Sequence, residues 1–151
     1  MRAIVFAIAA GLCWGIGELF TKSVLHTGRI GPITAIAVRS TIALPVLWLA
    51  YIIAVHHRRV PGEPSNWLDA GTGNLVKLAI GGGLIAGAGG MLFFYAALGA
   101  GEIGRVKPIA FAAAPAVAVT LGWLILGEPM TARKAAGVLV ILVGVFLLTG
   151  N

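Results

Sequence analysis

The stretch IVFAIAAGLCWGIGELFTKSVL, residues 4–25, decides the fold class. It is predominantly apolar over about 20 residues, which is the length that a helix needs to cross the hydrocarbon core of a bilayer. Two charged side chains, Glu18 and Lys22, lie inside it one helical turn apart. We expect the stretch to remain in the mature protein, because these charges interrupt it and no clear A-x-A cleavage site follows.

The rest of the chain has the same membrane-protein character. Of its 151 residues, 59% are hydrophobic and 11% are charged, and the mean hydropathy is +0.99. A soluble domain is about 25% charged, so this chain has too few polar residues to cover a water-exposed surface. The sequence therefore predicts an all-α, polytopic integral membrane protein. Its transmembrane helices are expected at about 3–24, 32–55, 75–98, 106–126 and 132–150.

The segments between these helices are short except for residues 56–74, where Pro61, Gly62 and Pro64 break regular structure. Five spans in so short a chain leave no room for a soluble domain. We therefore expect residues 1–151 to form a single transmembrane domain whose first partner is the lipid bilayer.

The net charge of +6 is distributed at the ends of the apolar segments, as in His56-His57-Arg58-Arg59. This pattern suits anionic headgroups. It does not suit nucleic acid, because no basic stripe with interleaved aromatic residues is present.

The Lys and Arg residues also indicate an orientation. With a cytoplasmic N-terminus, six lie inside and four outside, Arg39 being left aside as intramembrane. The inside set is Arg2, Arg58, Arg59, Lys77, Arg133 and Lys134, and the outside set is Lys22, Arg29, Arg105 and Lys107. The count favours an inward N-terminus in the cell (plasma or inner) membrane, and so small a bias leaves insertion in both orientations open.

Glu18 and Arg39 are the deepest charges. Glu18 lies about seven residues from the outer end of the first expected helix and Arg39 about seven residues into the second, which is roughly 10 Å at 1.5 Å per residue, and the two are symmetric about the turn near Gly28-Arg29. An antiparallel hairpin brings the two to the same depth. A charge near the bilayer centre costs roughly 2.5–3.5 kcal/mol on insertion scales, and pairing relieves that cost. We expect Glu18 to pair with Arg39, while Lys22 either snorkels to the interface or joins the pair.

Two interpretations of these charges stay open. In the first, they form a static ion pair that locks the hairpin. In the second, they line a polar cavity in which Arg39 and Lys22 attract an anionic or carboxylate-bearing solute. Glu18 would then exchange a proton or bind a cation.

Other side chains extend this candidate site. Trp14 and Tyr95 each bring a large ring with one polar group to a deep position. Lys107 is expected to begin the helix at 106–126, next to Pro108, as an interfacial anchor or a solute contact. The candidate substrate-binding residues are thus Trp14, Glu18, Lys22, Arg39, Tyr95 and Lys107.

Glycine spacing predicts close helix packing. Gly11 and Gly15 form one GxxxG pattern, and Gly83 and Gly87 form another. Small residues let backbones approach closely in lipid. The helix at 75–98 is glycine-rich enough to be a moving element as well as a tightly packed one.

No enzyme is predicted. The sequence contains no HExxH, GxSxG or P-loop motif. Its single cysteine, Cys13, excludes an internal disulfide and a CxxC metal site. We therefore assign no catalytic residue, metal or cofactor.

Several motifs along the chain belong together. They are Trp14-Gly15 followed by Lys22, Tyr95-Ala96-Ala97-Leu98, Pro115, Leu126-Gly127-Glu128-Pro129, and the run from Gly137 to Gly144. In this order, and over nearly the whole chain, the sequence resembles the EamA-type domain of the drug/metabolite transporter superfamily. LGEP followed by a glycine-rich last helix is the more specific part of the resemblance.

The resemblance implies a transporter with five helices per domain. Most relatives are similar to two fused domains, the second inverted in the membrane, whereas this chain has one. It implies a homodimer, antiparallel as in the related four-helix small multidrug resistance proteins or parallel, or else a heterodimer with another five-helix domain.

The function implied is transport of a small polar or amphipathic metabolite, amino-acid-like or drug-like, by alternating access. The alternative is a non-transporting membrane subunit, or half of a heterodimeric transporter. The acidic coupling residue of the four-helix relatives corresponds to Trp14 here, so a proton-coupling role for Glu18 rests on physical argument alone.

Overall fold

The computed structural model of this protein describes residues 2–149. The described chain is helical, with turns and no strand, and five of its helical segments are long and apolar enough to span a membrane. These segments are Arg2–His26, Pro32–His57, Thr72–Ala100, Ile103–Leu126 and Ala132–Thr149. The predicted fold class is confirmed. The third and fourth spans begin three residues earlier than expected, and position 150, the predicted end of the fifth, lies outside the described residues.

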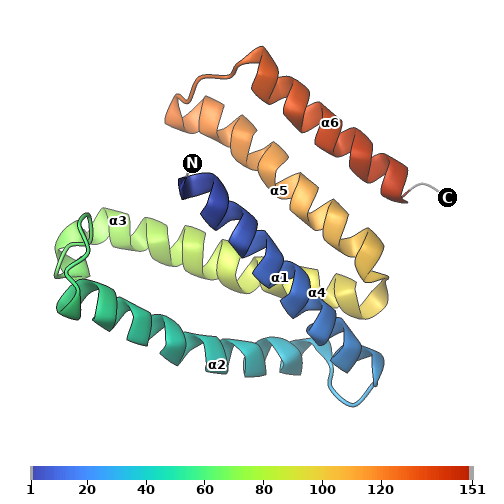
Figure 1. Cartoon of the computed structure of the whole chain (residues 1–151), viewed down its shortest axis with the longest axis horizontal. Helices are drawn as coiled ribbons and strands as arrows, with labels where there is room; N and C mark the ends of the chain where they lie inside the picture. Colours follow the sequence, from blue (N-terminus) through green and yellow to red (C-terminus); the bar gives the residue numbers. More distant parts are fainter. Residues whose placement is uncertain (1, 150–151) are drawn as a thin grey trace. The chain divides into compact units, whose positions relative to one another are not determined.

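The chain falls into two compact units, Met1–Gly99 and Ala100–Asn151. The first contains α1 (Arg2–His26), α2 (Pro32–Tyr51), η1 (Ile52–His57), η2 (Trp67–Ala70), α3 (Thr72–Lys77), η3 (Leu78–Gly89) and most of α4 (Gly90–Ala100). The second contains α5 (Ile103–Leu126) and α6 (Ala132–Thr149), which lie side by side as an antiparallel pair (Figure 1).

Turn chemistry explains where the helices begin and end. Pro32 occupies the first helical position of α2 behind an extended Gly31, where its missing N–H is not needed. At the other hairpin, Gly127 ends α5 in the left-handed conformation, with φ of 68°. Glycine is the residue that adopts this conformation without a steric penalty. Both turns were readable as helix boundaries in the sequence.

The third span is unusual because its middle, η3, is a π-helix of 12 residues. Such wide turns are rare in helices and are usually brief. They bring the carbonyl of residue i−5 close to the following glycines: a Cβ at Gly87 would lie 3.0 Å from the Gly82 oxygen. The glycine richness that the sequence associated with packing or motion therefore also suits this widened backbone.

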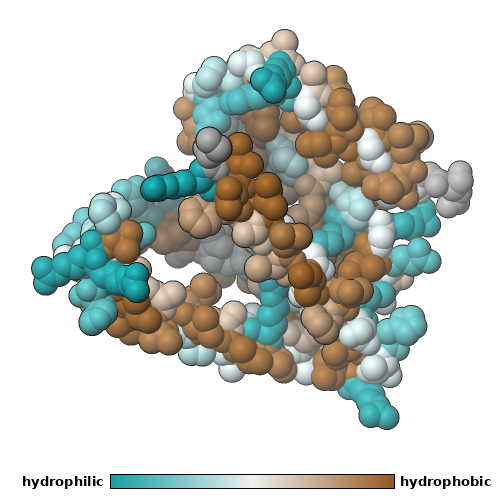
Figure 2. All heavy atoms as spheres, in the orientation of Figure 1, coloured by the Kyte–Doolittle hydropathy of each residue, from teal (hydrophilic) through white to brown (hydrophobic). Residues whose placement is uncertain are grey.

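Most large apolar side chains of the single chain are exposed. Figure 2 shows hydrophobic residues over much of the visible helix surface, with hydrophilic residues where the loop after η1 lies and in further groups near other helix ends. Open space lies beside both Gly11 and Gly15. The buried residues of the described chain are few: Glu18, Val55, Tyr95, Leu98, Ala112 and Gly122. Lipid or another chain must cover the rest, as composition predicted.

Candidate functional site

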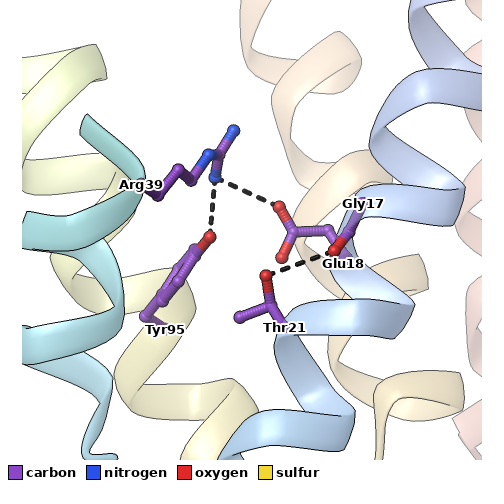
Figure 3. Close-up of polar contacts among 5 residues, drawn as sticks. All are labelled: Gly17, Glu18, Thr21, Arg39 and Tyr95. Carbon is purple, nitrogen blue, oxygen red and sulfur yellow. Dashed lines mark hydrogen bonds and ion pairs between the residues drawn. The ribbon is translucent and has the colours of Figure 1, made fainter. Parts of the chain in front are cut away.

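Glu18 is the buried charge at the centre of the candidate site. It lies on α1 with 5% of its surface exposed, and among residues 2–149 it is the one buried charged side chain. Its Oε1 lies 3.2 Å from Nη1 of Arg39 on α2 (Figure 3). The chain runs toward the turn in α1 and away from it in α2, so residues equally far from the turn on the two helices lie at similar positions along them. The pairing expected from sequence symmetry is confirmed.

Tyr95 is the third member of the cluster. It comes from α4 and is fully buried. Its hydroxyl oxygen accepts a hydrogen bond of 2.9 Å from the same Nη1 of Arg39, and the guanidinium carbon lies 5.7 Å from its ring centroid. A guanidinium near an aromatic face gains a further attraction. The sequence proposed Tyr95 as a deep polar ring, but linear spacing does not say which face of α4 turns toward α1 and α2.

The cluster leaves bonding capacity unused. The ion pair joins one nitrogen to one oxygen, and its 3.2 Å separation exceeds the 2.7–2.9 Å usual for charged N–H···O pairs. The second carboxylate oxygen of Glu18, Oε2, is buried and has no hydrogen-bond partner in the described chain. An unsatisfied buried acceptor costs about 1–3 kcal/mol. Glu18 is therefore held less well than a structural ion pair usually is.

Arg39 is open on one side. Its side chain is 35% exposed in the single chain. Both of its hydrogen bonds come from Nη1, so within the described residues Nη2 and Nε bond to no other group. A guanidinium does not face hydrocarbon without a partner. Its open edge must face water, a second protein chain or a ligand.

Lys22 has a different neighbour from those the sequence suggested. Its Nζ donates a 2.7 Å hydrogen bond to the Leu98 carbonyl, in the last turn of α4, where carbonyls lack helical partners. At the same end a Cβ at Gly99 would lie 2.9 Å from Pro32 Cγ. Lys22 thus fastens α1 to the end of α4, close to where α4 meets the start of α2. No sequence signal pointed to this backbone acceptor.

The two remaining candidates lie in different units. Trp14 is 50% exposed and lies one turn before Glu18 on the same face of α1. Lys107 belongs to the second unit, in the second turn of α5, so the expectation that it begins the helix is wrong. Its Nζ lies 5.3 Å from the Phe111 ring centroid. Pro108 is accordingly inside the helix, in its second turn, where the missing N–H removes one i→i−4 hydrogen bond.

The LGEP turn has a packing role of its own. Glu128 N donates to the Gly122 carbonyl at 3.0 Å, and a Cβ at Gly122 would lie 3.3 Å from Glu128 Oε2. Lys134 Nζ lies 3.9 Å from the same carboxylate oxygen. Gly122 therefore makes room for the Glu128 side chain over α5, a contact that the motif alone did not predict.

Two further features bear on the choice of site. A largely apolar cavity of about 610 Å³ is lined by residues that include Trp48, Tyr51 and Trp67, at the end of α2 remote from the turn. Across residues 2–149, no three His, Cys, Asp or Glu side chains gather as a metal site would need. The buried charges are thus the feature with the clearest chemistry.

Comparison with known proteins gives a family. The model of the family described as "EamA-like transporter family" matches residues 1–150. No curated protein sequence matches the chain, and no solved structure does.

Proposed function

From the premise that this chain belongs to the EamA-like transporter family, we propose that it carries a small polar or amphipathic solute across a membrane. Members of this family are transporters and not enzymes. In this proposal residues 1–151 act as one EamA-type domain, and the solute is amino-acid-like or drug-like. The membrane is the cell (plasma or inner) membrane, where the six-to-four Lys and Arg distribution favours a cytoplasmic N-terminus but is small enough for copies of both orientations to be inserted.

The observation that carries the proposal is the buried cluster of Glu18, Arg39 and Tyr95. Ionisable groups inside transmembrane helices are costly, and they characteristically mark solute or ion pathways. Within residues 2–149 the cost is not fully offset, because Glu18 Oε2 has no hydrogen-bond partner there and one edge of Arg39 is open. A static lock between two helices would be better satisfied by a two-point ion pair.

We place the path beside this cluster. Trp14 and Lys22 lie one turn before and after Glu18 on the same face of α1. Lys107 remains a candidate contact of the second unit. Transporters of this kind hold their solute near the bilayer midplane and rock one helical bundle against another around it. A single five-helix domain needs a second bundle for that motion, so the active form in this proposal is a dimer.

Flux through reconstituted protein tests the proposal. Purified protein in liposomes is expected to accelerate uptake of at least one solute from a panel of labelled amino acids and a cationic aromatic dye. Glu18→Gln and Arg39→Ala are expected to lower that rate at least tenfold. Glu63→Gln, in the loop, and Arg29→Ala, in the α1–α2 turn, are the matched controls and should transport normally.

The possible results are distinct. Flux that is indifferent to Glu18→Gln and Arg39→Ala would reduce the cluster to a structural ion pair, while transport itself would stand. An absence of flux for the whole panel would contradict transport by this chain alone. It would favour the alternative of a membrane subunit, or of half a heterodimeric transporter.

A further inference from the structure

We propose that the solute carries a carboxylate, which replaces Glu18 as the partner of Arg39 while Glu18 takes up a proton. The inference rests on the proposed transport function and adds the class of solute and the coupled ion. It follows from the geometry of one ion pair in the first unit (Figure 3).

The first step concerns the guanidinium. Arg39 uses a single nitrogen, Nη1, for both Glu18 and Tyr95, and its Nη2 and Nε donors make no hydrogen bond within the described chain. A guanidinium binds a carboxylate best through two parallel N–H···O bonds. Glu18 offers one oxygen at 3.2 Å. A solute carboxylate that approaches the open edge can offer both of its oxygens.

The second step concerns what holds Arg39 during the exchange. The Tyr95 hydroxyl accepts from Nη1 at 2.9 Å, and its ring is fully buried beside the guanidinium. This neutral contact does not depend on the charge of Glu18. It therefore keeps the guanidinium in place when the carboxylate partner changes. In this role Tyr95 is a positioning residue.

The third step concerns the proton. Arg39 of α2 is the ion-pair partner of Glu18, and the Tyr95 hydroxyl of α4 bonds to the same Arg39 nitrogen. On α1 itself Lys22 follows one turn later, with its Nζ on the Leu98 carbonyl. Once the solute occupies Arg39, a buried carboxylate loses its nearest cation, and an apolar interior does not sustain that charge. Glu18 accordingly takes one proton from water. An O–H bond forms on Glu18, no other covalent bond changes, and one anion and one proton enter together without net charge.

The exchange of partners at Arg39 couples transport of the solute to transport of a proton. The solute-bound state contains a protonated Glu18 that has left Arg39, and the empty state contains the Glu18–Arg39 pair. Solute and proton are therefore bound together and released together. The expected stoichiometry is one proton with each carboxylate, in the same direction across the membrane.

Binding to the whole purified protein in weakly buffered detergent tests the inference, with a pH-indicator dye to follow protons. The probes are acetate, benzoate and indole-3-acetate, each compared with its neutral amide, and benzylammonium. At least one carboxylate is expected to bind with uptake of about one proton, and its amide at least tenfold more weakly. Because binding takes up a proton, the carboxylate affinity should rise as the pH falls, by about tenfold per pH unit.

Two variants test whether proton uptake depends on Glu18 and carboxylate binding on Arg39. Glu18→Gln keeps the shape of the side chain, and it should bind the carboxylate without proton uptake and with an affinity that no longer varies with pH. Arg39→Lys retains the charge but loses the two-point geometry, and it should bind at least tenfold more weakly. Glu63→Gln and Arg29→Lys are the matched controls. Should Arg39→Lys fail to fold, Glu18→Gln decides the question alone.

Three results would overturn the inference. They are an amide that binds as tightly as its carboxylate, proton uptake that persists in Glu18→Gln, and binding of benzylammonium but of no carboxylate. In each case liposome flux of another solute would leave the proposed function intact. Failure of every probe and of the earlier solute panel to cross liposomes would instead contradict transport itself.

Discussion

At the scale of single residues, the two partners of the ion pair have unequal surroundings. The Glu18 side chain is 6% exposed, whereas that of Arg39 is 35% exposed and also bonds to Tyr95. Loss of Arg39 removes the cation that pairs with Glu18 and leaves this carboxylate in an apolar interior. Loss of Glu18 leaves a guanidinium that keeps the Tyr95 contact and an open edge. Removal of Arg39 is therefore expected to destabilise the protein more than removal of Glu18.

This asymmetry predicts the order of stability among three variants. Arg39→Gln should lower the free energy of unfolding by about 3–5 kcal/mol, the usual cost of stranding a buried charge. Glu18→Gln should lower it by less than about 2 kcal/mol, since only a weak hydrogen bond is lost. The double variant should be more stable than Arg39→Gln alone. Denaturant unfolding of the purified protein in mixed micelles measures all three.

If Arg39→Gln and Glu18→Gln lowered the free energy of unfolding equally, the two partners would not differ as expected from their surroundings. A double variant whose loss is the sum of both would also contradict the prediction, because residues that interact directly are not additive. Arg29→Gln, in the exposed turn between α1 and α2, is the control for removing an arginine, and it should change stability by no more than about 0.5 kcal/mol.

Single residues also show which contacts could be predicted from the sequence and which could not. Equal spacing from the turn at Gly28 was enough to pair Glu18 with Arg39, because an antiparallel hairpin converts sequence distance into depth. The same reasoning did not find the Tyr95 contact or the Leu98 acceptor of Lys22. Both depend on how α4 is rotated against α1 and α2, and side-chain types in a uniformly apolar helix contain little information about rotation.

At the scale of elements, the third span differs most from expectation. A transmembrane helix was predicted at 75–98, and the structure has a span over Thr72–Ala100 whose middle, Leu78–Gly89, is a π-helix. The glycines there were visible in the sequence, but several conformations suit glycine. Only the backbone itself shows that Gly87 approaches the Gly82 carbonyl.

Alanine substitution of two glycines in η3 tests the widened backbone. A methyl group at Gly87 would lie 3.0 Å from the Gly82 oxygen, whereas one at Gly81 meets nothing within 4 Å. Gly87→Ala should therefore destabilise the protein by about 1–3 kcal/mol, as overpacking does. Gly81→Ala should be neutral or should stabilise by up to about 1 kcal/mol, since alanine is the better helix former.

Melting temperatures of both variants in the same detergent provide the comparison. If Gly87→Ala and Gly81→Ala have the same melting temperature, the approach of Gly87 to the Gly82 carbonyl does not limit which residue position 87 accepts. Transport by Gly87→Ala, measured in the liposome assay above, would show in addition whether the wide turns matter for activity.

At the scale of the whole molecule, charge distribution governs insertion. The loops that lie inside with a cytoplasmic N-terminus hold only two more Lys and Arg residues than those outside, six against four. The positive-inside rule is strong when the difference is large. A small difference is what an antiparallel homodimer made from one chain requires, because copies of both orientations must be inserted.

Reporter fusions at Asn151 test this orientation. A reporter active only in the cytoplasm and one active only outside it should both give signal. Ser65→Lys should move the C-terminus outward, and Gly101→Lys should move it to the cytoplasm, because each added lysine retains its loop inside. Ser65→Gln and Gly101→Gln are the uncharged controls. One fixed location of the C-terminus in all five proteins would exclude the antiparallel dimer.

The sequence by itself determined that this is a membrane protein of five helices, and that two of its charges lie at one depth. Apolar length and spacing along a helix are local quantities, so they survive in any arrangement of the helices. Only the tertiary structure decided that Tyr95 joins the pair, that Lys22 bonds to the end of α4, and that Glu18 Oε2 is left without a partner in the described chain. Those contacts depend on helix rotation and close approach, which bring together residues separated by as many as 76 positions, as Lys22 and Leu98 are.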